Sequence, residues 1–177
     1  MQKLKDVKTL TTVAMLLAIA IVLGFLKIPI TELIELRFQF LPIAIGAMLF
    51  GSGIGGLLGA LTDILAYLVK PTGAFFPGFT ICAIVSGIIY GLFFYKKKIS
   101  LPRLLAGALT EAIICELLIK SLCLMILYGN PFWVVLSARI LKTAIMYPIN
   151  VFLLFVILKP AKQLLPKALG TQTAAEE

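Results

Sequence analysis

From residue 10 to residue 158 the chain is a nearly unbroken series of apolar stretches, punctuated by glycine and proline. Six ionisable side chains lie inside these stretches, namely Asp63, Glu111, Glu116, Lys120, Arg139 and Lys142. A charge placed in hydrocarbon is penalised by roughly 2.5–3.5 kcal/mol per residue on insertion scales. We therefore expect these groups to face an internal polar site and not lipid, so the sequence predicts a membrane protein with a buried site.

Composition supports the same class of protein. Hydrophobic residues make up 61% of the 177 positions and charged residues only 14%, which does not fit an ordinary soluble domain. Apolar segments recur along the chain, so a signal peptide does not explain them. The sequence has no histidine, and Cys82, Cys115 and Cys123 lack metal-ligand spacing. We expect no metal, and we interpret the three cysteines as small core residues.

Segment lengths predict an all-α membrane protein, a six-transmembrane-helix bundle with ordered outer loops, because a crossing helix needs roughly 20 apolar residues. The expected helices are 10–27, 39–52, 53–70, 78–95, 103–129 and 131–158. The short second helix meets the third through Gly51, Ser52 and Gly53, which indicates a tight hairpin. We expect a single integral membrane domain over 1–170 and a disordered tail over 171–177.

The distribution of lysine and arginine predicts the orientation, because cytoplasmic loops are rich in these residues. With both termini in the cytoplasm, the outer side holds only Lys27, Arg37 and Lys70. The inner side then holds ten basic residues: Lys3, Lys5, Lys8, Lys96, Lys97, Lys98, Arg103, Lys159, Lys162 and Lys167. The net charge of +8 is thus mostly topological, and no nucleic-acid partner is expected.

Two outer connections have unusual sequences. Residues 28–38 mix apolar and polar side chains without a helical stripe, which predicts an ordered, partly extended loop that could act as a lid. Residues 71–78 place Phe75 and Phe76 in a turn bounded by proline and glycine. These two aromatics are either an anchor at the membrane interface or a stacking wall for a flat ligand.

Helical spacing places polar residues on shared faces. One stripe contains Gly56, Gly59, Asp63, Tyr67 and Lys70. Another contains Arg139, Lys142, Met146 and Asn150. In the fifth helix Glu116 and Lys120 stand one turn apart and can neutralise each other.

The outer half carries a basic surplus, which suggests a site for an anionic ligand. Arg139 and Lys120 are the best candidates to receive it, with Arg37 as a third cation, whereas Asp63 could accept hydrogen bonds from ring N–H groups. The alternative is purely structural, because ionic groups within a membrane can also pair to hold helices together.

A second feature suggests a protein partner. Ala14 and Ala18 form a small-xxx-small pattern, which permits close helix contact in lipid, and Gly55/Gly59 and Gly56/Ala60 repeat it. Packing within the bundle would explain the same patterns.

Residues 8–160 resemble the substrate-capturing S components of energy-coupling factor (ECF) vitamin transporters in length, helix number, basic cytoplasmic ends, structured first outer loop and the Ala14/Ala18 pair. The folate-specific branch is most similar. The segments that carry this likeness are 36–43 (LRFQFLPI), 49–51 (LFG), Asp63, 71–80 (PTGAFFPGFT) and 87–91 (GIIYG). Branches for pantothenate, hydroxymethylpyrimidine and a queuosine precursor share much of the architecture.

The resemblance implies that this chain is not an enzyme but a high-affinity binding subunit in a prokaryotic cell membrane. It implies capture of a vitamin outside, docking on a transmembrane T component through Ala14 and Ala18, and delivery driven by two ATPase subunits. The chain has no phosphate-binding loop of its own, so ATP would be used only by those partners and no cofactor is expected here. A self-sufficient secondary transporter is the alternative class, although residues 10–95 and 103–158 show no convincing repeat.

For folate, the resemblance leads to a hypothesis about each candidate residue. Phe75, Phe76 or Trp133 would stack on the rings. Asp63 or Glu116 would accept hydrogen bonds from the pterin edge, with Tyr67 on the same stripe as Asp63. Arg139, Lys120 or Arg37 would meet the negative charge of the glutamate tail.

Overall fold

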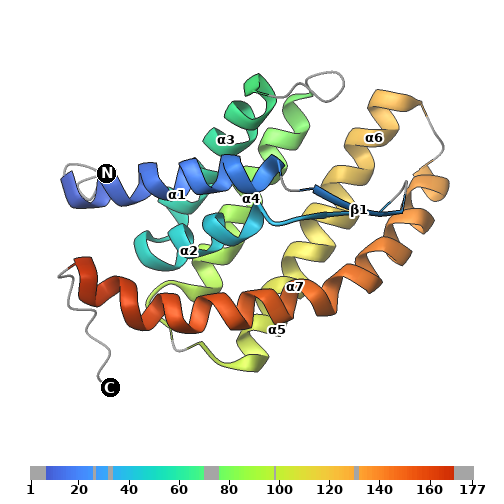
Figure 1. The fold of residues 1–177 in the computed structure, drawn as a ribbon. Coiled ribbons are helices and arrows are strands. Elements are labelled where there is room, and N and C mark those ends of the chain that lie inside the picture. Colours follow the sequence, from blue (N-terminus) through green and yellow to red (C-terminus); the bar gives the residue numbers. More distant parts are fainter. Residues whose placement is uncertain are drawn as a thin grey trace.

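The chain folds into a bundle of long helices that follow the apolar stretches of the sequence (Figure 1). The structure is a computed structural model that describes residues 7–25, 27–31, 34–69, 76–97, 99–129 and 132–169. Its helices are α1 (Val7–Phe25), α2 (Phe40–Phe50), α3 (Ser52–Val69), α4 (Pro77–Phe94), α5 (Leu101–Glu111), the π-helix η2 (Ala112–Ile119), α6 (Lys120–Tyr128) and α7 (Phe132–Leu169). Since α5, η2 and α6 follow one another without a break, the described residues form six helical rods.

The rods agree with the membrane class predicted from the sequence. Three of them, Ser52–Val69, Pro77–Phe94 and the segment Val135–Ala161 of α7, are long and apolar enough to cross a bilayer. Thr9–Gly24 and Phe40–Phe50 are shorter apolar helices. The predicted all-α membrane bundle is thereby confirmed, with helix ends that differ by a few residues from those expected and an α7 that extends well beyond residue 158. The expected tail over 171–177 lies outside the described residues.

The connection between α1 and α2 is a small antiparallel hairpin of β1 (Lys27–Thr31) and β2 (Ile34–Arg37). Lys27 pairs with Arg37, and the register shifts between Pro29 and Thr31. This is the segment for which the sequence predicts an ordered, partly extended loop. In the view of Figure 1 it extends from α1 toward the end of the bundle where α6 ends and α7 begins.

Helices α2 and α3 form the tight hairpin expected from the glycines around residue 51. Gly51 adopts φ +102°, a conformation that residues with a Cβ rarely adopt, and its N–H donates to the carbonyl of Ala47 at 3.0 Å. The turn brings α3 back along α2, so that the Cβ of Ala47 lies beside Gly55.

The contact between α3 and α4 depends on small residues at the crossing. A Cβ at Gly59 would collide with the carbonyl of Ala83, and one at Gly87 would collide with the carbonyl of Gly55. Close backbone approach of this kind is how helices gain packing energy where lipid supplies no hydrophobic drive. The Gly55/Gly59 pattern in the sequence is therefore explained by packing within the bundle.

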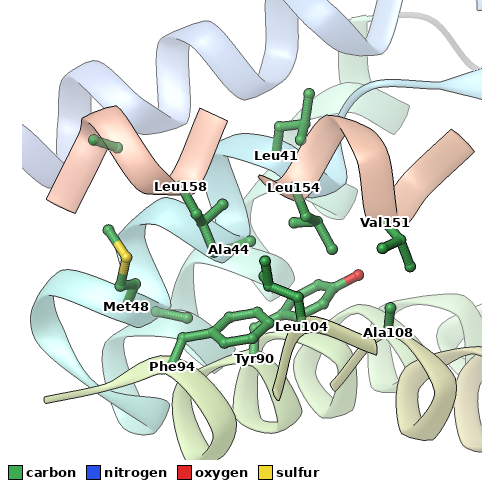
Figure 2. Packing of buried hydrophobic residues seen from close by; sticks show 12 residues of the cluster. Leu41, Ala44, Met48, Tyr90, Phe94, Leu104, Ala108, Val151, Leu154 and Leu158 are labelled. Carbon is green, nitrogen blue, oxygen red and sulfur yellow. The ribbon is translucent and has the colours of Figure 1, made fainter. Parts of the chain in front are cut away.

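A second packing centre joins α2, α4, α5 and α7 (Figure 2). Tyr90 and Phe94 of α4 stack with ring centroids 5.9 Å apart and an interplanar angle of 14°. Leu104 from α5 and Leu154 and Leu158 from α7 are fully buried against them. This cluster holds α7 to the rest of the bundle at the end where α4 finishes.

Replacing Gly59 by alanine tests the α3–α4 crossing. The added methyl group meets backbone atoms, which cannot rotate away, so we expect a loss of about 1–3 kcal/mol, typical of overpacking. Thermal unfolding of the purified protein in detergent measures the change. Gly53→Ala is the matched control, because a Cβ at Gly53 meets nothing within 4 Å, and it should leave the unfolding temperature unchanged or slightly higher. Equal effects of the two changes would contradict close packing at this crossing.

Candidate functional site

Glu116 is the centre of an ionic cluster inside the bundle. Lys120, on the same rod, donates to Glu116 Oε1, as the spacing in the sequence suggests. Arg139 reaches across from α7, with its Nη1 3.3 Å from Glu116 Oε2. One carboxylate thus contacts two cations from two rods.

The π-helix explains how Arg139 joins this cluster. The N–H of Lys120 donates to the carbonyl of Cys115, five residues earlier, and not to the carbonyl of Glu116 as it would in an α-helix. The Glu116 carbonyl instead accepts a hydrogen bond from Arg139 Nη1 at 3.2 Å. The wider turn therefore supplies a second acceptor for Arg139, and π-turns of this kind are frequent at functional sites.

The cluster is only partly buried. The side chains of Glu116, Lys120 and Arg139 keep 22%, 29% and 14% of their surface exposed. Lys142, one turn after Arg139, adds a third positive charge within electrostatic range of Glu116. Two cations thus contact this carboxylate and a third lies within electrostatic range, against Glu116 itself and Glu111, so the region carries a small surplus of positive charge.

Asp63 lies in a different contact. Thr80, in the first turn of α4, donates its hydroxyl hydrogen to Asp63 Oδ2 at 2.7 Å. No ion pair to Asp63 occurs among the residues that the structure describes. A carboxylate has two acceptor oxygens, so beside the Thr80 hydroxyl Asp63 can accept further hydrogen bonds.

The aromatic candidates differ in their surroundings. Phe76 is half-buried directly before α4 and packs edge-to-face on Phe79, with centroids 6.0 Å apart. Trp133, at the start of α7, is 77% exposed, and Tyr67 is half-buried on α3. Phe75 and the side chain of Arg37 lie outside the described residues.

Ala14 and Ala18 are exposed on α1, together with Met15 and Val22. A surface with two small side chains one turn apart permits another helix to approach closely. A partner contact at this exposed face stays a prediction.

The structure brings together Glu116, Lys120 and Arg139 out of the predicted residues and places Asp63 beside Thr80. Sequence reasoning missed Thr80, although it lies in the motif 71–80, because nothing in the spacing pairs it with α3. It also missed the link between Cys82 and Cys115, whose thiols each contact the other's backbone carbonyl at 3.6 Å. Burial of all three cysteines agrees with their interpretation as core residues.

The fold and the cluster together define a helical membrane protein that holds ionisable side chains inside its bundle. Residues 8–158 match the family model described as "ECF transporter, substrate-specific component". The chain belongs to this family.

Relatives of this chain are named for the vitamins that they transport. The chain is 37% identical over 153 residues to the folate transporter FolT of Clostridium novyi (strain NT), covering 86% of this chain and 88% of that protein. It is 31% identical over 144 residues to the riboflavin transporter RibU of Staphylococcus aureus (strain TCH60), covering 78% and 76%. Among solved structures, the crystal structure of FolT bound with folic acid superposes with a TM-score of 0.78 at 29% identity, covering 85% and 92%.

Glu116→Gln tests whether the carboxylate holds the cluster together. Removing it leaves Lys120 and Arg139 without their shared counter-charge. Breaking a fully buried pair destabilises by about 3–5 kcal/mol, and we expect about 1–3 kcal/mol here because the pair is partly exposed. Thermal unfolding in detergent gives the value.

The matched control is Glu111→Gln on the same rod, since Glu111 forms no ion pair with any other described residue. It should change stability much less. Equal loss from the two substitutions would show that Glu116 has no special role, whereas partial recovery in Glu116→Gln/Lys120→Met would support the uncompensated charge as the cause.

Proposed function

We propose that this chain is the folate-binding S component of an ECF transporter. It captures folate from outside the cell and delivers it through a T component driven by two ATPase subunits. The single observation that carries the proposal is the convergence of Lys120 and Arg139 on Glu116 inside a bundle that superposes on FolT. The alternative ligand is another vitamin, and riboflavin is favoured by the relative from Staphylococcus aureus.

Folate matches the chemistry of the two polar centres. Its glutamate tail carries two carboxylates, and the region around Arg139, Lys120 and Lys142 attracts negative charge. Its pterin carries N–H donors, for which Asp63 beside Thr80 offers an acceptor. Phe76 or Trp133, together with Phe75, would stack on the flat rings, while Tyr67 and Arg37 would complete the walls.

The proposed orientation has both termini in the cytoplasm of a prokaryotic cell. The start of α1 and the end of α7 lie at the same end of the bundle (Figure 1), and the basic residues Lys96, Lys97, Arg103 and Lys159 agree with the positive-inside pattern. The β1–β2 hairpin would then lie on the outer side, where a lid over the vitamin is useful.

Titration calorimetry with folate tests the binding residues. We expect Arg139→Ala to weaken folate binding about 30-fold or more, because a lost charge pair in a shielded site typically removes at least about 2 kcal/mol. Asp63→Ala should weaken it at least about tenfold through the lost charged hydrogen bond. Native mass spectrometry of the detergent-purified protein gives the identity of any retained ligand.

The matched control is Arg103→Ala, which removes an arginine from the same bundle roughly 20 Å along the rod from Glu116. It should bind folate as the unmodified protein does, and riboflavin should not displace folate at comparable concentration. Unchanged folate affinity in both Arg139→Ala and Asp63→Ala would remove these residues from the site.

Ala18→Trp tests the proposed docking face for the T component. A bulky ring on this small-residue stripe prevents close helix approach, so co-purification of the T component should fall several-fold while folate binding is retained. Ile19→Trp places the same ring on an exposed position of α1 that is turned by about 100° from Ala18, and it serves as the control. In liposomes, the chain alone should bind folate without transporting it. Uptake without the ATPase subunits would favour a self-sufficient carrier.

A further inference from the structure

A groove between α5 and α7 is separate from the vitamin site. Its volume is about 320 Å³, and its lining is apolar, with Leu101 and Leu105 on the α5 side and Val151, Phe152 and Phe155 on the α7 side. Figure 1 draws α5 and α7 adjacent, and the two helices pack on each other. Phe152 and Leu101 are 66% and 52% exposed, so the groove opens to the outside of the bundle.

The two ends of the groove differ chemically. Toward the middle of α7, the hydroxyl of Tyr147 donates to the carbonyl of Leu105 at 3.0 Å, so this bond joins the two helices that line the groove. At the other end, the ammonium group of Lys159 lies 4.5 Å from the ring centroid of Phe155. Four residues of α7 recur at intervals of four and therefore share one face: Tyr147, Val151, Phe155 and Lys159. This face begins at the hydrogen-bonded tyrosine and ends at a cation.

The length of the groove along α7 corresponds to the thickness of one leaflet of a bilayer. From Tyr147 to Phe155 the groove follows α7 for about 12 Å, and Lys159 lies about 6 Å further on, at 1.5 Å per residue. Half of a hydrocarbon core is about 15 Å. The cation is therefore placed at the depth where lipid headgroups begin when the apolar lining faces acyl chains.

Among the described residues, the charged side chains at the Lys159 end of the bundle are all basic. Lys96 and Lys97 follow α4 and Arg103 lies in the first turn of α5, at the end of the bundle where Phe94 packs in one cluster with Leu158 of α7. The carboxylates Asp63, Glu111 and Glu116 all lie farther along their helices. Among the described residues, an anionic headgroup at this end would thus meet only basic side chains. A headgroup without net charge would gain less from them.

We propose that the α5–α7 groove binds an acyl chain of an anionic phospholipid, with the lipid headgroup beside Lys159. The site does not depend on the proposed function, because it shares no residue with the Glu116 cluster. Its occupancy would hold α5 and α7 together on the surface that faces lipid.

Native mass spectrometry of the full chain in detergent, with phosphatidylglycerol or phosphatidylcholine added, tests the proposal. Phosphatidylglycerol should be retained preferentially. Lys159→Gln should lower its retention about fivefold, the change expected when one lysine is lost near an anionic surface. Leu105→Trp should lower retention at least as much, because the indole fills the groove from its 38% exposed α5 side.

Matched controls separate this site from general attraction. Lys97→Gln removes an equal charge from the same end of the bundle, and Leu109→Trp adds the same ring one turn along α5 outside the groove. Both should retain phosphatidylglycerol as the unmodified protein does. Equal retention of the two lipids, equal effects of Lys97→Gln and Lys159→Gln, or no effect of Leu105→Trp would overturn the proposal. So would a shift from dimer to monomer in Leu105→Trp, which would make the groove a contact between copies.

Discussion

The contact of Glu116 with Lys120 and Arg139 is the interaction on which the interior of this protein depends. Charges inside an apolar bundle require partners, and here one carboxylate joins the fifth rod to α7 through its side chain and its backbone carbonyl. Lys142 adds a further positive charge within electrostatic range of the same carboxylate. Structural pairing at Glu116 therefore does not exclude the role in anion binding that we propose for this cluster.

The glycine crossing of α3 and α4 gives the other polar centre a fixed position. Gly55, Gly59 and Gly87 allow the two backbones to touch, and one turn beyond this crossing Asp63 and Thr80 are hydrogen-bonded between the same helices. A site built on closely packed helices holds its acceptor more precisely than a site on loops. The vitamin site proposed here therefore lies between a rigid α3–α4 pair and a cluster held by ionic contacts.

Much of the fold follows from the sequence, because bilayer thickness fixes helix length and glycines mark the turns. Gly51 predicts the α2–α3 hairpin, and the four-residue spacing of Glu116 and Lys120 predicts their pair. The extended segment before α2 is also anticipated, though not its pairing into two strands. Other contacts have no sequence signal: Thr80 meets Asp63 across two helices, and Arg139 reaches a carbonyl that only a π-turn exposes. Spacing along one helix determines shared faces, whereas contacts between helices depend on packing that no single segment encodes.

The π-helix also determines how a deletion within residues 112–119 would affect the rod. Each residue turns an α-helix by about 100°, whereas a wide turn accommodates one extra residue and leaves the faces that follow on the rod unchanged. A one-residue deletion just before Cys115 would let the rod close as a regular α-helix while Lys120 and Cys123 keep their sides. Chains that are compared across residues 112–119 need a gap there wherever the helix is regular, and an ungapped comparison would assign the lysine of the cluster to the wrong position.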